Sequence, residues 1–214
     1  MPHSSRSSTL AVTAASSGPG VIFVIDTSSA MTALAVIDES GVVEREEVFP
    51  TIRNLSMADH LRSLAGAAMP AKIAVATGPG SFTGLRVGVS FGLGLAMGLR
   101  IPIVPLPTLD LQAARSDEPA TAVSEAGRGR VYYQLPGGEP ALGEASEIPK
   151  TYRLVGWVAP KTEAALEQSS HVLRPERELR TFGQAAAIVL EKAREVPYGS
   201  LKLEYMQSFA SKSI

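Results

Sequence analysis

The sequence predicts an α/β protein, and three observations point to that class. Strand-like and helix-like segments alternate through the first half of the chain, a continuous apolar run opens the pattern, and a glycine-rich loop joins a second buried strand to a long apolar helix. The expected elements are strands at 21–26, 32–38, 42–49, 73–77 and 101–104, with helices at 56–68 and 82–99. A meander followed by helix-separated strands predicts a sheet with an antiparallel and a parallel part.

The first three strands are marked by their own residues and by the turns between them. The run 21–26 is apolar almost throughout, as a central strand requires, and Thr27-Ser-Ser29 supplies turn chemistry before the next strand. Glu39-Ser-Gly41 forms the second turn, and the charged run Glu44-Arg-Glu-Glu47 suits the solvated edge of a sheet. With the helices and strands that follow, this order predicts a ribonuclease-H-like lobe.

The second half predicts a smaller and more irregular lobe. Three prolines, at 102, 105 and 107, are expected to break regular structure before it begins. A hairpin is expected from 121–124, through a Gly127-Arg-Gly129 turn, to 131–134, with a further strand at 154–158. Thr181 and Gln184 stand at capping-box spacing and open a helix that runs to Arg194.

The expected division of the chain has three parts. Residues 1–20 are rich in Ser, Thr, Ala, Gly and Pro without periodicity, and we expect a flexible tail there. The ribonuclease-H-like lobe then takes residues 21–109, and the smaller lobe takes residues 110–214.

The composition narrows the functional classes. The chain has 214 residues, 45% of them apolar and 19% charged, which is enough to bury a core. A net charge of -1 argues against a protein that binds nucleic acid on its own, because such proteins usually carry a basic field. The chain has no cysteine, which excludes disulfides and a thiol nucleophile and fits a reducing cytoplasm. The longest apolar run, 87–99, is shorter than the roughly 20 residues of a membrane span.

The most informative segment is Thr77-Gly-Pro-Gly-Ser-Phe-Thr-Gly-Leu-Arg-Val-Gly88. Its glycine spacing fits neither the Gly-x-Gly-x-x-Gly dinucleotide fingerprint nor a Walker A loop, which would need a Lys-Ser/Thr pair. The backbone N–H groups of Gly80, Ser81 and Phe82 stand at a helix N-terminus and could attract a phosphate or a carboxylate. A purely structural turn is the alternative.

A second candidate for anion binding lies at the end of the first strand. Asp26, Thr27 and Ser28 stand where a lobe of this type could hold a metal-bound phosphate, and an Asx turn is the structural alternative. If this segment faces Gly80–Phe82 across a cleft, we expect weak binding of ATP or ADP there, with binding at a partner interface as the alternative and no cofactor required. The three histidines, His3, His60 and His171, are widely separated in sequence, so no histidine metal site is predicted.

The helix 82–99 contains five glycines, and each costs about 1 kcal/mol relative to alanine in a helix interior. Gly84, Gly88 and Gly92 recur every four residues on one face, where the lack of side chains lets another backbone come close. The sequence therefore predicts a partner interface at these glycines and at Arg86 of the same helix. The alternative is that this face packs against its own sheet.

An enzymatic alternative comes from Gly88-Val-Ser-Phe-Gly92, which matches the Gly-x-Ser-x-Gly elbow of serine hydrolases. Asp110 or Asp117, followed by His171, would supply the chain order of the triad. An elbow serine stands on a tight strand-to-helix turn, whereas Ser90 falls two turns inside the predicted helix. The pattern is therefore a poor match to a hydrolase.

These motifs resemble a known family. The run GPGSFTGLRVG, preceded by VIFVIDTSSAMTALAV and followed by IPIVPLPTLDLQA, is similar to the bacterial TsaB (YeaZ) family across residues 21–112. The run EAGRGRVY, residues 125–132, resembles the family's Asp-Ala-Arg-x-Gly-x-Val-Tyr hairpin, with Glu125 for Asp and Gly127 for Arg. Two features depart further: LEYMQ at 203–207 stands for Pro-x-Tyr-Leu-Arg, and the stretch from His60 to Ile73 is shorter by about a dozen residues.

The resemblance implies an actin/Hsp70-like (ASKHA) fold of two ribonuclease-H-like lobes and a role in making N6-threonylcarbamoyladenosine at position 37 of tRNA. In that family the protein is not the transferase, and its older glycoprotease label is a misnomer. It dimerises with itself and with the catalytic, metal-binding paralogue TsaD, and the ATPase TsaE joins them. The resemblance thus implies a non-catalytic, cytoplasmic scaffold that meets tRNA only through the complex, in agreement with the glycine-faced helix.

Overall fold

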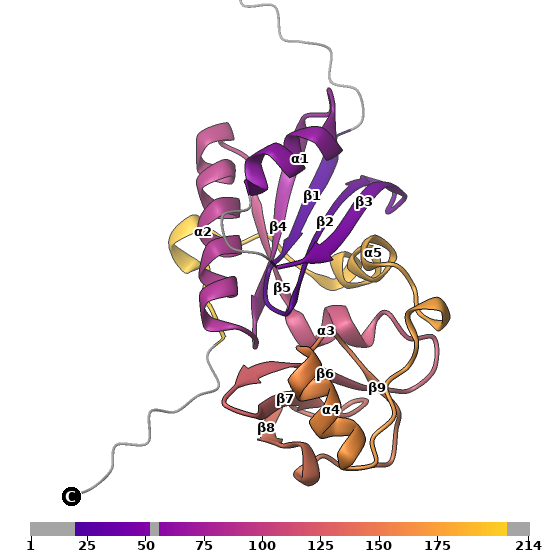
Figure 1. The fold of residues 1–214 in the computed structure, drawn as a ribbon. Helices are drawn as coiled ribbons and strands as arrows, with labels where there is room; N and C mark the ends of the chain where they lie inside the picture. Colours follow the sequence, from indigo (N-terminus) through magenta and orange to yellow (C-terminus); the bar gives the residue numbers. More distant parts are fainter. Residues whose placement is uncertain (1–19, 52–55, 205–214) are drawn as a thin grey trace, which may run out of the picture.

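The structure is a computed structural model that describes residues 20–51 and 56–204. The predicted tail, apart from Gly20, lies outside the described residues, and so do His3 and residues 205–207 of the C-terminal motif. The described chain forms a five-stranded sheet with the order β3-β2-β1-β4-β5 and a four-stranded sheet with the order β8-β7-β6-β9 (Figure 1).

The first sheet has the predicted mixed topology. The first three strands form an antiparallel meander, and the other two strands run parallel to β1. Its strands are β1 (Val21–Asp26), β2 (Met31–Asp38), β3 (Val43–Pro50), β4 (Pro70–Gly78) and β5 (Ile103–Pro107). The predicted ribonuclease-H-like lobe is confirmed.

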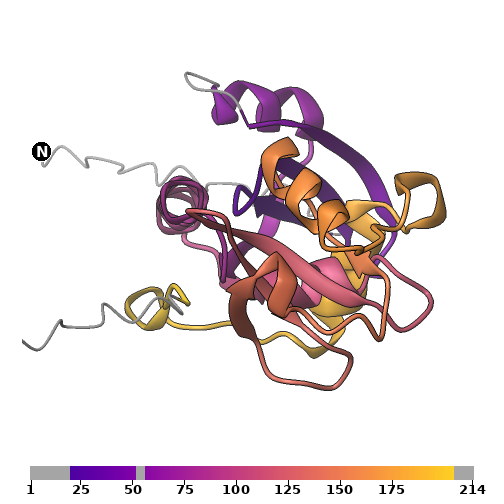
Figure 2. The ribbon, with the colours of Figure 1, turned by 60° about the horizontal axis from the view of Figure 1, so that its bottom comes forward.

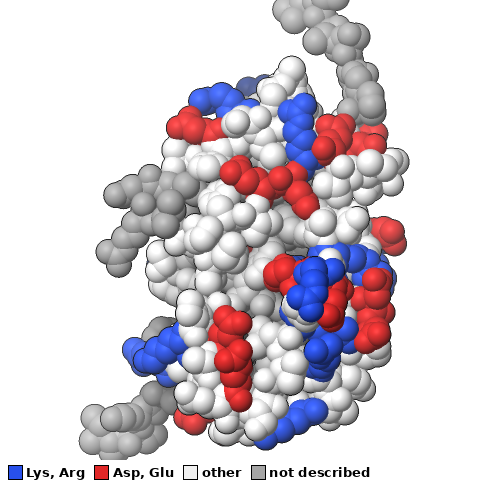
Figure 3. Space-filling model, turned by 45° about the vertical axis from the view of Figure 1, so that its right-hand side comes forward, with Lys and Arg blue, Asp and Glu red and all other residues white. Residues whose placement is uncertain are grey.

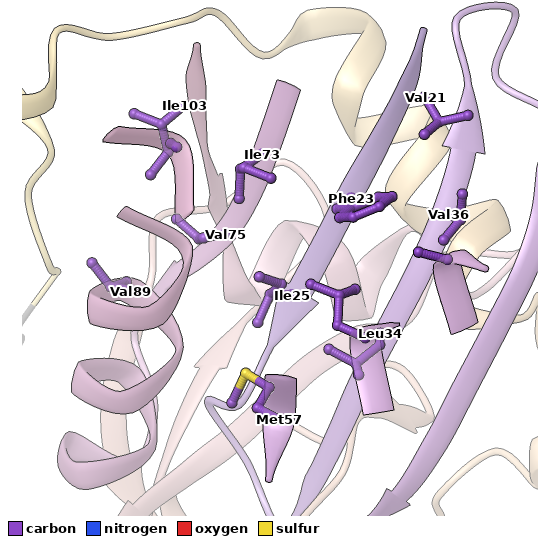
Figure 4. Packing of buried hydrophobic residues seen from close by; sticks show 13 residues of the cluster. Val21, Phe23, Ile25, Leu34, Val36, Met57, Ile73, Val75, Val89 and Ile103 are labelled. Atoms are coloured by element: carbon purple, nitrogen blue, oxygen red, sulfur yellow. The ribbon is translucent and has the colours of Figure 1, made fainter. Parts of the chain in front are cut away.

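Helices cover both faces of this sheet, which is why β1 is apolar from residue 21 to residue 25. On one face lie α1 (Met57–Ala65) and α2 (Phe82–Leu99), packed on alternate strand residues such as Phe23 and Ile25 (Figure 4). The intervening residues, Val24 among them, point to the other face and pack against α5 (Phe182–Lys192). Both faces of β1 are therefore buried.

The second lobe is built on the smaller sheet. Its strands are β6 (Thr121–Gly127), β7 (Arg130–Gln134), β8 (Ala141–Glu144) and β9 (Leu154–Val155), and its helices are α3 (Thr108–Ala113) and α4 (Pro160–Gln168). The predicted hairpin is β6–β7, and its turn has positive φ at residues 127–129. The Glu125 carboxylate accepts hydrogen bonds from Ala159 N (3.0 Å) and Thr162 Oγ1 (2.8 Å), which fixes the start of α4.

The last part of the chain returns to the first lobe. Helix α5 opens with the predicted Thr181–Gln184 capping box and then packs on the first sheet. Beyond it, Val196 N donates to the Ile103 carbonyl (3.0 Å), and Tyr198 Oη donates to the Ile101 carbonyl (2.8 Å). These contacts tie residues of the stretch 110–214 to the first lobe, and the division at residue 110 stays a prediction.

Some expected boundaries are wrong. Pro105 and Pro107 were expected to interrupt regular structure, but both lie within β5, paired with Val75 and Gly78. Proline is tolerated there because β5 is at the edge of the sheet, where an N–H is needed on one side only. The elements α3, β8 and α4 were not predicted from the sequence, although proline is favoured in the first turn of a helix and Pro160 begins α4.

Candidate functional site

The glycine-rich loop and the β1–β2 turn meet, as the anion-site hypothesis required, but they meet in direct contact. Ser81 N donates to the Ser28 carbonyl (2.7 Å), and a Cβ at Gly80 would stand 2.4 Å from that same oxygen. Ser81 also caps α2, since its Oγ accepts from Gly84 N (3.3 Å). A phosphate between the two segments would have to separate groups that already bond to each other.

The β1–β2 turn adopts the structural alternative, an Asx turn. Ser28 N donates to Asp26 Oδ1 (2.7 Å), and both residues are fully buried. Asp26 Oδ2 and Ser28 Oγ have no hydrogen-bond partner among the described residues. Burial raises the pKa of Asp26, while the hydrogen bond from Ser28 N and the charge of Arg115 act in the opposite direction.

Arg115, which follows α3, lies close enough to this turn for its charge to act on Asp26. Its side chain is 2% exposed, forms an ion pair with Glu176 and donates to Gln112 Oε1 (3.3 Å). Its guanidinium carbon lies 4.2 Å from the ring centroid of Trp157, and Trp157 Nε1 donates to Glu176 (3.1 Å). Burial lowers the pKa of Arg115, and the Glu176 carboxylate opposes this effect. The Arg115 guanidinium is thus held by Gln112, Trp157 and Glu176, all within the stretch 110–214.

The face of α2 that carries Gly84, Gly88 and Gly92 points inward. A Cβ at Gly84 would lie 1.9 Å from the Thr27 carbonyl oxygen, and one at Gly88 would lie 2.3 Å from Thr27 Oγ1. A Cβ at Gly92 would lie 2.3 Å from Val75. Thr27 Oγ1 also donates to the Gly84 carbonyl (2.7 Å). The prediction that these glycines admit a partner helix is wrong in this structure, because the backbone they admit is the chain's own.

The opposite side of α2 is exposed and apolar. We call it the outer face of α2; its exposed residues are Phe82, Thr83, Arg86, Val87, Ser90, Gly94, Met97, Gly98 and Leu99. The exposed fractions of Phe82, Val87 and Met97 are 50%, 51% and 53%. Arg86 is the only charged residue within the helix, and its guanidinium carbon lies 3.8 Å from the Phe82 ring centroid. Figure 2 looks close to the axis of α2 and places it at the periphery of the molecule.

The outer face has its own stripe of small residues. Ser90, Gly94 and Gly98 recur every four residues, and a Cβ at either glycine would meet no atom within 4 Å. The sequence contained this second stripe, but its period of four is the same as that of the buried one. Across its 18 residues α2 has a mean hydropathy of 1.4, enough by length and composition for a membrane span, and 28% of it is buried.

The hydrolase residues are not brought together. Ser90 lies within α2 on the outer face, so it does not stand on a strand-to-helix turn. His171 is buried in the second lobe with Nε2 2.9 Å from the Ala145 carbonyl, and Asp117 forms an ion pair with Arg180. The described ranges contain no group of three or more His, Asp or Glu side chains that could hold a metal ion.

Comparison with known proteins gives related matches in sequence and in fold. A family model described as "TsaD: tRNA N6-adenosine threonylcarbamoyltransferase" matches residues 57–169. The TsaB protein of Bacillus subtilis, named for tRNA threonylcarbamoyladenosine biosynthesis, is 33% identical over 123 residues, covering 53% of this chain and 54% of that protein. Escherichia coli TsaB is 32% identical over 93 residues, covering 41% and 40%. The chain therefore matches about half the length of these relatives.

Solved structures support the fold. YeaZ from Pseudomonas aeruginosa superposes with a TM-score of 0.65 at 18% identity, covering 87% of this chain and all of that one. A second Pseudomonas aeruginosa structure, of a protein with similarity to peptidase YeaZ, gives a TM-score of 0.61 at 21% identity, covering 88% and 100%. The predicted two-lobed α/β fold of the actin/Hsp70-like type agrees with these neighbours.

Proposed function

We propose that this chain, which belongs to the family described as "TsaD: tRNA N6-adenosine threonylcarbamoyltransferase", is a non-catalytic subunit in threonylcarbamoyladenosine biosynthesis. Its curated relatives are TsaB proteins named for that pathway. In this proposal the chain binds a TsaD-like catalytic subunit and contributes structure to the complex, while the transfer chemistry belongs to the partner.

The outer face of α2 carries the proposal. Phe82, Val87 and Met97 are each about half exposed, although burying such a side chain is worth roughly 1.5 to 3 kcal/mol. Ser90, Gly94 and Gly98 leave a smooth strip between them, along which a partner helix can approach closely. Arg86, the one charge of the helix, lies near the start of α2 with its guanidinium carbon 3.8 Å from the Phe82 ring centroid, at the border of this strip.

The same face supports self-association as a competing state. Two copies related by a two-fold axis would bury the same residues against each other, so a homodimer and the complex with the catalytic subunit would exclude one another. A TsaE-like ATPase and tRNA then join through the complex. Basic and acidic side chains lie intermixed on the face in Figure 3, which does not form a continuous basic surface for a phosphate backbone.

To test this proposal, the chain is mixed with the TsaD-like protein of the same organism, and light scattering measures the mass of the complex that forms. We expect a complex with the wild type and at least about a tenfold loss of affinity with Val87→Glu, which places a charge in the interface. Val42→Glu is the matched control, because Val42 is 59% exposed in the β2–β3 turn, away from α2. A complex unaffected by Val87→Glu would contradict the docking face, and no complex at all would contradict the proposed role.

Catalysis is tested with the same proteins and unmodified tRNA. We expect threonylcarbamoyladenosine to form when the TsaD-like subunit is present, and none to form with this chain alone. Modification by the isolated chain would overturn the non-catalytic assignment.

A further inference from the structure

A groove of about 600 Å3 lies between the start of β2 and the second lobe, and it shares no residue with the outer face of α2. Apolar side chains form much of its lining, including Met31 from β2, the indole of Trp157 and the exposed side chain of Val172. Its volume is within the roughly 300 to 1,000 Å3 range of ligand pockets.

The walls of the groove are held by backbone contacts. Leu154 N donates to the Val172 carbonyl (2.9 Å), and Arg174 N donates to the Leu154 carbonyl (2.9 Å), so the strand and the segment that lines the groove are paired. Gly156 has φ +150°, and a Cβ there would stand 2.0 Å from the Val123 carbonyl oxygen. Only glycine lets this wall lie so close to β6, which gives the groove its shape.

The charge that remains free at the groove is negative. Glu163 and Glu167 lie one turn apart on the exposed side of α4, and neither has an ion-pair partner within residues 20–51 and 56–204. The other charged lining groups are occupied: Arg174 pairs with Glu118, and Glu176 pairs with Arg115. His171, also in the lining, has Nε2 2.9 Å from the Ala145 carbonyl.

We propose that this groove binds a segment of a partner protein that combines apolar side chains with lysine or arginine. Met31, Val172 and the Trp157 ring receive the apolar groups and the aliphatic stems of the basic ones. Glu163 and Glu167 then face the cationic heads at the rim. The same carboxylates repel phosphates, so the groove selects against nucleotides and RNA. This inference does not depend on the proposed role in tRNA modification.

Trp157 gives a direct readout, because it is the only tryptophan of the chain and it lines the groove. The experiment titrates the full chain with a peptide of about ten residues that alternates lysine and leucine, and follows tryptophan emission. We expect a saturable change with a Kd of about 10 to 100 µM, weakened several-fold as salt rises from about 0.05 to 0.5 M. A peptide alternating glutamate and leucine should bind at least about tenfold more weakly. Equal binding of both peptides, or no saturable change with the basic one, would overturn the proposal.

Charge variants locate the binding. Glu163→Gln with Glu167→Gln should weaken the lysine-leucine peptide by about tenfold, and the melting temperature shows whether the variant remains folded. Glu44→Gln with Glu139→Gln changes the net charge equally at exposed positions outside the groove and should leave the Kd within about twofold. Equal weakening by both pairs would assign the binding to overall charge and refute the site.

Discussion

The two sides of α2 carry the same sequence signal and have opposite surroundings. Gly84, Gly88 and Gly92 recur every four residues and lie against Thr27 and Val75 of the chain itself. Ser90, Gly94 and Gly98 recur at the same spacing on the exposed side. Small residues at this spacing therefore identify a face of close approach, but they do not reveal whose backbone approaches it.

The apolar residues around each stripe distinguish the two sides. Between the inner glycines stand Leu85 and Val89, which are buried in the first lobe, whereas Val87 and Met97 beside the outer stripe are about half exposed. A helix that is apolar all round must be covered on both sides, and the first sheet covers only one. This is the physical reason for assigning the partner to the outer face.

The largest expected effect is that of Gly84→Ala. The added Cβ would meet a backbone oxygen of the β1–β2 turn, and that turn cannot move aside because Thr27 and Ser28 are hydrogen-bonded to the α2 segment. We expect a loss of stability of about 3 kcal/mol or more, at the upper end of the range for overpacking. Thermal unfolding should show a melting temperature lower by roughly 6 to 12 °C.

Gly94→Ala is the matched control for this substitution. Its Cβ would meet no atom within 4 Å, and alanine is the better helix former by about 1 kcal/mol, so the melting temperature should rise slightly. Equal melting temperatures for the two variants would contradict the claim that only the Gly84 side of the helix is closely packed.

The next largest effect is on association, and we expect it only for substitutions on the outer face of α2. Gly94→Leu should leave the monomer folded, since the residue is exposed, but should weaken the homodimer and the complex with the catalytic subunit by about tenfold or more. Sedimentation velocity measures both. Gly88→Leu makes the opposite prediction, a lower melting temperature from a clash with Thr27, and association lost only with folding. Normal association of Gly94→Leu would remove the outer stripe from the interface.

The sequence was sufficient for the first lobe because its signals are local. The turn residues between the strands, the continuous apolar run of β1 and the N-cap Ser81 of α2 each determine structure within a few residues of themselves. The direction of the inner glycines depends instead on Thr27, which lies 57 residues from Gly84 and is brought there by the sheet. The anion-site hypothesis depended on Asp26–Ser28 facing Gly80–Phe82 across a cleft; the two segments do meet, but spacing alone could not distinguish a cleft from direct contact.

A smaller effect concerns the turn against which the inner face packs. Burial raises the folded-state pKa of Asp26 above its ordinary 3.8, so the ionised form is disfavoured in the folded protein. The contribution to stability is fully present below about pH 4 and is lost as pH rises through the raised pKa. Asp26→Asn keeps the acceptor for Ser28 N and removes the ionisation. We therefore expect the variant to be more stable than the wild type at pH 7, and the difference in melting temperature should shrink towards about pH 4.

Wild type and variant must be compared at each pH, because the pKa values of Asp110 and Glu204 are raised as well and change the pH dependence of both proteins. A difference that stays constant with pH would mean that Asp26 has the same pKa in the folded and the unfolded protein, and it would contradict the raised pKa.

Nucleotide binding should be weak or absent at the same turn. With Ser81 N bonded to the Ser28 carbonyl and no lysine within the loop sequence 77–88, ADP or ATP would gain few charge-assisted contacts and would have to part the two segments. Isothermal calorimetry is expected to give a Kd no tighter than about 0.1 to 1 mM. A sub-micromolar constant, abolished by Gly80→Ala, would mean that the contact opens and that the turn is a binding site.

The smallest expected effect is that of Ser90→Ala. Ser90 is exposed on α2 beside Gly94, so alanine keeps the side chain small and preserves the smooth strip that a partner helix would approach. His171, the base that the hydrolase pattern would need, lies in the second lobe against the Ala145 carbonyl and is not beside this hydroxyl. We expect complex formation, tRNA modification by the complex and the melting temperature all to remain within error of the wild type.

Ester or peptide hydrolysis by the pure chain that disappears in Ser90→Ala would instead support the serine hydrolase alternative. A large loss of association would instead assign this hydroxyl a hydrogen bond across the interface, and Ser90→Thr, which retains the hydroxyl but adds a methyl group to the strip, would separate that bond from simple packing.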